Sequence, residues 1–181
     1  MFTSKRVSSV GIAALAAAFA LGVAGAIPAD APHFGKPISP ADTTAWDISI
    51  GPDGVGLPPG SGTPAQGAIV YAQKCALCHG DKGQGGPNAR LVGGQITGDG
   101  PVVKTVGSYW PYATTLFDFV RRAMPWTEPK TLTNDEVYAV SAYVLQLNGI
   151  IGESDVMSAK TLAAVKMPNR DGFIPLYPGK H

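Results

Sequence analysis

Cysteine is scarce in this chain of 181 residues, and neither sign of charge is in excess. The two cysteines are Cys75 and Cys78, and the histidines are His33, His79 and His181. A structural zinc site needs about four protein ligands. The chain has one cysteine pair, and His33 and His181 lie near its opposite ends, which argues against zinc. The 14 basic residues balance 13 acidic ones, which gives no sign of nucleic-acid binding.

Long apolar runs are also absent, except near the N-terminus. Residues 10–23 are almost wholly apolar and small, Lys5 and Arg6 precede them, and Ala24–Ala26 has the A-x-A form of a signal-peptidase site. The run is shorter than the ~20 residues that cross a bilayer comfortably, so we expect no stable membrane anchor, although an uncleaved anchor is the alternative. The sequence therefore predicts a signal peptide over residues 1–26, cleavage after Ala26 and a periplasmic protein.

The two cysteines form the motif Cys-x-x-Cys-His over residues 75–79. This spacing allows two thiols to bond covalently to one haem while the next residue, His79, ligates its iron. A thioredoxin-like redox pair would need a βαβ pattern around it, which is absent, whereas a simple disulfide is also possible. The motif occurs once, and therefore predicts one haem c held by Cys75 and Cys78.

Three helices are predicted around this motif. The first begins at a capping box, Thr63 to Gln66, and the last at a second box, Thr133 to Glu136. The middle helix spans 115–123 and is followed by Met124. A proline at 125 disfavours the α conformation for the residue before it, so Met124 leaves the helix there.

The pattern at this point resembles the class I cytochromes c, in which a glycine and an aromatic residue precede the haem motif at the offsets of Gly67 and Tyr71. The resemblance implies an all-α class I cytochrome c fold, in which N- and C-terminal helices cross over one covalently bound haem. It implies Met124 as the second iron ligand, with Met167 and Met157 as weaker candidates.

Further site residues follow from the same resemblance. The carbonyl of Pro87 is expected to accept the imidazole N–H of His79 and to fix the ring. Tyr109 and Trp110 are expected to hold a haem propionate through their polar atoms, although core packing explains both nearly as well.

A closer resemblance is to the cytochrome c subunits of bacterial sulfur-oxidation dehydrogenases, namely the sulfane dehydrogenase cytochrome (SoxD type) and the cytochromes that partner periplasmic sulfite dehydrogenase. The chain is smaller than the sulfane dehydrogenase form, which carries two haems, and this favours the sulfite partner or a free carrier. The resemblance implies a molybdenum-cofactor dehydrogenase as electron donor and a downstream cytochrome or terminal oxidase as acceptor. It rests on residues 46–48, 51–54, 60–62, 106–115, 121–125 and 165–173.

The predicted organisation has four parts: a signal peptide (1–26), an extended arm with a Gly/Pro linker (27–62), a cytochrome c domain (63–150) and a C-terminal extension that packs on it (151–181). Within the arm, the alternation of Trp46, Ile48 and Ile50 suggests one strand-like segment, with disorder as the alternative. The predicted function is one-electron transfer and not catalysis. The alternatives are a haem enzyme with an open iron site and a structural haem subunit of a dehydrogenase complex.

Overall fold

The computed structural model describes residues 35–44, 46–174 and 176, so the predicted signal peptide, its cleavage site and His33 lie outside the described residues. The chain divides into two compact units, one ending at Trp46 and one beginning at Asp47. The first contains the short helix α2 (Pro40–Thr44), where the Asp42 carboxylate accepts hydrogen bonds from the backbone and hydroxyl of Ser39. Among the described helices, none combines the length and apolar character needed to cross a membrane.

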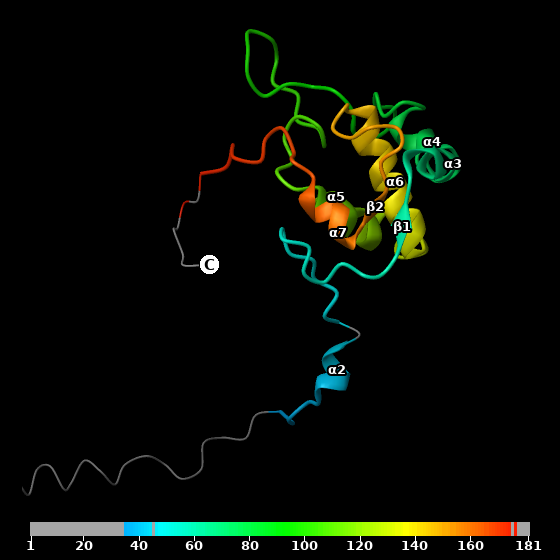
Figure 1. Ribbon diagram of the computed structural model, residues 1–181, viewed down its shortest axis with the longest axis vertical. Helices are drawn as coiled ribbons and strands as arrows, with labels where there is room; N and C mark the ends of the chain where they lie inside the picture. Colours follow the sequence, from blue (N-terminus) through cyan, green and yellow to red (C-terminus); the bar gives the residue numbers. More distant parts are fainter. Residues whose placement is uncertain (1–34, 45, 175, 177–181) are drawn as a thin grey trace, which may run out of the picture. The chain divides into compact units, whose positions relative to one another are not determined.

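The second unit is built from five helices and one minimal sheet (Figure 1). The two strands pair antiparallel, with Ser61 opposite Ser158. The predicted all-α class is therefore correct, with a two-residue ladder added to it. The elements are β1 (Ser61–Gly62), α3 (Pro64–Lys74), α4 (Ala76–His79), α5 (Ala113–Ala123), α6 (Asn134–Leu147), β2 (Met157–Ser158) and α7 (Ala159–Ala164).

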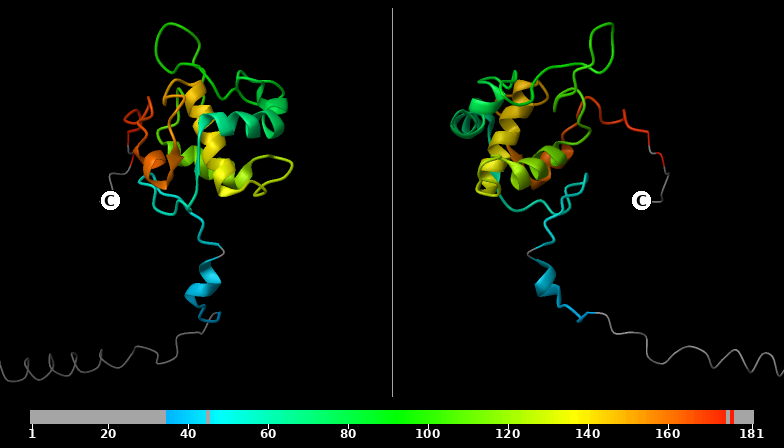
Figure 2. Two further views of the ribbon diagram at one scale, coloured as in Figure 1. Left: turned by 45° about the vertical axis from the view of Figure 1, so that its right-hand side comes forward. Right: turned by 180° about the vertical axis from the view of Figure 1, so that it is seen from behind.

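Helices α3 and α6 cross at close range (Figure 2). A Cβ atom at Gly67 would overlap the carbonyl group of Ala139 on α6 and lie 2.8 Å from Cβ of Tyr143. One turn further along α3, the Tyr71 ring meets that of Tyr143 edge to face, with centroids 5.3 Å apart. The crossing expected from the positions of Gly67 and Tyr71 is confirmed.

Both predicted capping boxes are present, and they fix where α3 and α6 begin. The Thr63 side chain accepts from the backbone N–H of Gln66, and Thr133 does the same for Glu136. Helix α5 ends with two arginines in its last turn, and α6 is followed by Gly149 at φ +67°, a conformation that favours glycine.

Helix α6 is buried on nearly all sides. Its residues from Val137 to Leu145 are buried apart from Tyr143. Met157, Leu162 and Met167, which all follow α6 in the sequence, belong to the same hydrophobic cluster as Phe117 of α5. Residues 151–167 therefore complete the core.

Strand β1 and the segment before it also contact α6. The Tyr138 hydroxyl donates to the Pro58 carbonyl at 2.8 Å, and the Ser61 N–H donates to the Asp135 carboxylate at 2.7 Å. The compact unit thus begins at Asp47, upstream of the predicted domain start at residue 63.

The strand-like segment suggested by Trp46, Ile48 and Ile50 forms no paired strand in the described residues, although Ile48 and Ile50 are half-buried and Ile50 packs against the core cluster. Trp46 is 85% exposed and no strand pairs with residues 47–50. The Ile48 carbonyl accepts from the Arg122 guanidinium at 2.8 Å, and Gly51 begins a turn in which its N–H donates to the Val55 carbonyl at 2.8 Å. Alternation predicts a strand only where a partner supplies the ladder, and here turn and side-chain bonds satisfy the backbone instead.

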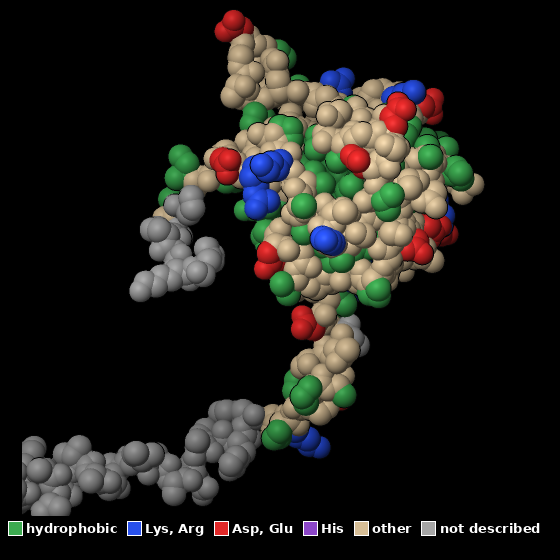
Figure 3. All heavy atoms as spheres, in the orientation of Figure 1, with side chains coloured by type: hydrophobic (Ala, Val, Ile, Leu, Met, Phe, Trp, Pro, Cys, Tyr) green, Lys and Arg blue, Asp and Glu red, His purple; other side chains and the backbone are tan. Residues whose placement is uncertain are grey.

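Figure 3 shows one face of the molecule, on which apolar side chains gather near the middle of the second unit and charged side chains lie scattered around them.

Candidate haem site

The haem motif occupies the junction between α3 and α4. Cys75 is the C-cap of α3 and also the N-cap of α4, with φ −124° and ψ −37°. Its carbonyl accepts from the N–H groups of Cys78 at 3.1 Å and His79 at 3.0 Å. One tight turn therefore holds both thiols and the imidazole, and both cysteines are free and half-buried.

The His79 ring is oriented by one hydrogen bond. Its Nδ1 lies 2.7 Å from the Ala89 carbonyl oxygen. A carbonyl can only accept, so Nδ1 carries the proton and Nε2 keeps a free lone pair. An imidazole fixed in this way is a typical metal ligand, because the bond sets its tautomer and increases its basicity.

The acceptor of this bond corrects one sequence prediction. Pro87, whose carbonyl was expected to accept from His79, is exposed, and the acceptor lies two residues further along. The reason is local: the Asn88 N–H donates to the Cys78 carbonyl at 3.0 Å, and the Gly86 N–H donates to the Asn88 carbonyl at 3.1 Å. This turn places Ala89 against the ring.

Burial determines the protonation of the Cys75 thiol. It raises the pKa of Cys75 to about 11, although nearby Lys74 lowers it in part. The thiol is therefore protonated at neutral pH, whereas the reactive cysteine of a redox pair has a pKa lowered towards neutrality or below. This environment disfavours a thioredoxin-like role for the motif.

The three candidate methionines differ in whether their side chains belong to the hydrophobic core. Met157 and Met167 are only 4% and 3% exposed and belong to the hydrophobic cluster. Met124 is half-buried, and its backbone is extended at φ −121° and ψ 146°. It is the C-cap residue of α5, and its N–H donates to the Val120 carbonyl. Its thioether is thus outside the core cluster, and its role as second ligand stays a prediction.

Tyr109 and Trp110 lie on the segment that leads into α5, and both are half-buried. The Lys104 ammonium lies 4.5 Å from the centroid of the Tyr109 ring. The Trp110 ring meets Phe119 of α5 edge to face at 5.7 Å. Packing against these neighbours is established, whereas a propionate contact stays a prediction.

The donor set fits a covalently bound haem. It consists of two unpaired thiols on one turn, an imidazole whose Nε2 is free, and a thioether outside the core. It does not fit a protein metal site of the zinc type, because the described residues contain no cluster of three or more His, Cys, Asp or Glu side chains.

Comparison with known proteins agrees with this assignment. A protein-family model described as cytochrome C oxidase, cbb3-type, subunit III matches residues 62–144. A chain in the crystal structure of the sulfane dehydrogenase SoxCD from Paracoccus pantotrophus is 40% identical, with a TM-score of 0.74 over 80% of this chain and 72% of that one. No curated protein matches the sequence. The chain belongs to the class I c-type cytochromes.

Membership of this family implies that the cytochrome carries covalently bound haem and transfers electrons. The family-model match runs from β1 into α6. The match to the SoxCD chain covers 80% of the cytochrome and so extends beyond residues 62–144 into the flanking segments. The similarity to the SoxCD chain therefore includes part of the chain that buries α6.

Two contacts of the site were not predicted from the sequence. The Ala89 carbonyl is a backbone atom, and no side-chain pattern marks a backbone acceptor. Asn148 receives the Gly93 N–H on its Oδ1 at 3.0 Å and donates to the Leu91 carbonyl at 3.3 Å, which ties the end of α6 to the chain following the His79 loop. An asparagine at a helix end indicates only a helix cap, so nothing in the sequence indicates its bonds to Gly93 and Leu91.

Proposed function

We propose that this cytochrome is a periplasmic monohaem carrier of single electrons. It receives them from a molybdenum-cofactor dehydrogenase of sulfite or a related sulfur compound and passes them to a downstream cytochrome or terminal oxidase. One observation carries the sulfur-compound assignment: the 40% identity, over most of both chains, to a chain of a sulfane dehydrogenase structure.

The residues that would hold the haem have distinct tasks. Cys75 and Cys78 would each add a thiol S–H across a vinyl group, forming one C–S and one C–H bond with no net oxidation. His79 would ligate iron through Nε2 while Ala89 keeps its Nδ1–H occupied. Haem c, when bound, supplies a one-electron couple.

Met124 would supply the second ligand to the iron through its thioether. A methionine ligand gives a higher reduction potential than a second histidine. If His79 and Met124 both ligated the iron, no position on it would remain for a substrate, and this supports a carrier over a haem enzyme.

The organisation proposed for the chain keeps four parts: a signal peptide over 1–26, an arm over 27–62, a cytochrome domain over 63–150 and an extension over 151–181. Export is supported by the signal-like composition of the first 26 residues. N-terminal sequencing of protein purified from the periplasm should begin at Ile27, and a start at Met1 would contradict the cleavage site.

The donor is tested by mixing the oxidised cytochrome with sulfite and the candidate molybdenum dehydrogenase. Haem reduction, followed by absorbance, should require all three components, and omission of the dehydrogenase is the control. If the haem stays oxidised in the complete mixture, the partner assignment is wrong, even where the protein contains one covalent haem.

The ligand is tested with a matched pair of variants, Met124→Leu and Met167→Leu. Leucine conserves volume, so the change in packing alone should cost less than about 1.5 kcal/mol of stability in either variant. The red charge-transfer band of the oxidised protein, which reports the bond from methionine sulfur to iron, should vanish in Met124→Leu and persist in Met167→Leu. The reverse pattern would show that Met167 is the ligand.

A further inference from the structure

The segment after α7 returns to the aromatic residues that precede α5. The Asn169 side chain donates through Nδ2 to the backbone carbonyl of Tyr109 at 2.6 Å. The Phe173 ring meets the Tyr109 ring edge to face at 5.2 Å, and the Arg170 guanidinium lies 4.3 Å from the centroid of the Tyr112 ring. We call Asn169, Arg170 and Phe173 the clamp, and residues 109–112 the aromatic strip.

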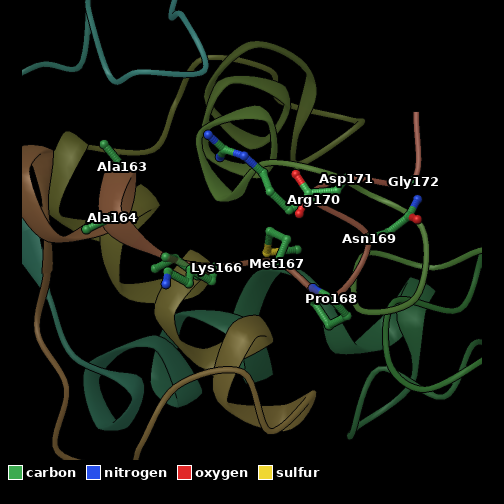
Figure 4. Close-up of a pocket in the computed structure, with 10 residues that line it drawn as sticks. Ala163, Ala164, Lys166, Met167, Pro168, Asn169, Arg170, Asp171 and Gly172 are labelled. Atoms are coloured by element: carbon green, nitrogen blue, oxygen red, sulfur yellow. The ribbon is translucent and has the colours of Figure 1, made fainter. Parts of the chain in front are cut away.

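The clamp is anchored in the core and is not a loose tail. Met167, just before it, is 3% exposed and belongs to the central cluster, and Asn169 is 8% exposed. Backbone hydrogen bonds close the bend, and in one of them the Arg170 N–H donates to the Met167 carbonyl at 3.0 Å. A Cβ at Gly172 would overlap the Asn169 amide, so a larger residue at position 172 would have to displace that side chain. Figure 4 shows the bend, which lines a hollow of about 620 Å³.

The strip connects directly to the elements of the haem site. Tyr112 is the N-cap residue of α5, whose other end is capped by Met124. Trp110 packs on Phe119 within the same helix. A change in the position of the strip therefore reaches both the proposed propionate residues and the helix that presents the proposed iron ligand.

We propose that the clamp residues Asn169 and Arg170 are positioning residues, which hold the aromatic strip in place at the haem site and thereby set the reduction potential of the cytochrome. The proposal rests on the proposed function, because it needs a haem at Cys75–His79. Its physical basis has two parts that act in the same direction. Arg170 is exposed but holds its positive charge against the strip, which would favour the reduced haem, and a strip fixed beside the haem would limit water access, which would also favour the less charged reduced form.

The chain offers a matched control for charge. Lys166 is exposed and lies on the same segment, and its ammonium group is well apart from the Arg170 guanidinium in Figure 4. Arg170→Gln and Lys166→Gln each remove one positive charge from this segment, but only the first removes the contact with Tyr112. Asn169→Ala removes the bond to the Tyr109 carbonyl without changing charge.

The experiment is an equilibrium redox titration of the full-length purified cytochrome and its variants, each checked for covalent haem content. Arg170→Gln and Asn169→Ala should each change the redox equilibrium constant at least threefold towards the oxidised form, about 28 mV at 59 mV per decade. Lys166→Gln should change it far less, and Arg170→Lys, which keeps a cation above Tyr112, should restore most of the wild-type potential.

Three results would overturn the proposal. An equal shift in Lys166→Gln and Arg170→Gln would reduce the effect to net charge. A shift in Arg170→Gln with none in Asn169→Ala would reduce it to the local charge of Arg170 and would overturn the positioning role of the clamp. Unchanged reduction potentials in both Arg170→Gln and Asn169→Ala would refute the proposal. If Asn169→Ala does not fold, the pair Arg170→Gln and Lys166→Gln decides alone. A preparation without covalent haem would refute the proposed function and this inference together, whereas a wrong electron donor would leave this result unaffected.

Discussion

Replacing Gly67 by alanine tests the helix crossing on which the fold depends. Gly67 lies in the interior of α3, and a Cβ atom there would overlap the Ala139 carbonyl and come within 2.8 Å of the Tyr143 Cβ atom. The first neighbour is backbone and cannot rotate away, so the two helices must move apart. Extra atoms in a packed core typically cost 1–3 kcal/mol, and an overlap with backbone belongs at the upper end, about 3 kcal/mol.

An opposing effect reduces this loss. Alanine is a better helix former than glycine by about 1 kcal/mol, and Gly67 has no positive φ that would strain it. The expected net destabilisation is therefore about 2 kcal/mol. For a chain of this size that corresponds to a fall in Tm of roughly 4–8 °C.

The assay is thermal and guanidinium unfolding followed by far-UV circular dichroism, on variants with equal haem content. Ala72→Gly, at an exposed position of the same helix, measures the helix-propensity part alone and should lower stability by about 1 kcal/mol. If Gly67→Ala were as stable as wild type or more so, the helices could not approach as closely as described, and the reasoning would be refuted.

Three further predictions concern α6 and its ends. Thr133→Ala should lower the free energy of unfolding by about 1 kcal/mol, because it removes the cap on the Glu136 N–H, and denaturant unfolding would measure the loss. The pKa of Glu136 is held below its ordinary value of 4.5, chiefly by the backbone hydrogen bond from Thr133, so this group stabilises the folded state above about pH 4.5 and the contribution is lost as pH falls through the lowered pKa. Glu136→Gln keeps a capping side chain and should flatten this part of the acid unfolding curve; an unchanged curve would show that Glu136 contributes nothing. Asn148→Ala should cost about 0.5–1.5 kcal/mol by removing the hydrogen bonds to the Gly93 N–H and the Leu91 carbonyl, and faster hydrogen exchange of the Gly93 amide would locate the effect.

The parts predicted from the sequence are those encoded by local side-chain chemistry. Thr63 and Thr133 mark helix starts because a hydroxyl three residues before a Glu or Gln satisfies backbone donors at short range. Gly67 could be assigned to a helix crossing because the resemblance supplied the partner helix. The middle helix was expected from 115 to 123 and begins two residues earlier, at Ala113, a difference within the usual uncertainty at helix ends.

The parts that were missed depend on backbone atoms or on distant partners. The acceptor for His79 is a carbonyl whose position follows from the turn at Gly86–Asn88, and the expected Pro87 lies two residues away from it. The strand-like segment over 46–50 lies on the domain through Ile50 but forms no ladder, and the same limit explains why. Its alternation is real, but a strand needs a neighbouring backbone, and the sequence does not show which segment would provide one.

The burial of α6 explains why the cytochrome domain needs residues outside it. A helix that is apolar on one stripe can leave its other side to solvent, whereas a helix that is apolar all round must be covered all round. The stripe of Val137, Val140 and Val144 accounts for one side only, and Tyr138 and Leu145, both 0% exposed, lie outside it. Segment 58–62 covers part of this remainder through the bond from Tyr138 to Pro58, and residues 157–167 add three buried side chains to the same cluster. The two flanking segments meet each other in the β1–β2 ladder. The segment that completes the core thus continues directly into the clamp, so the covering of α6 and the positioning of the aromatic strip are consequences of one arrangement of the chain.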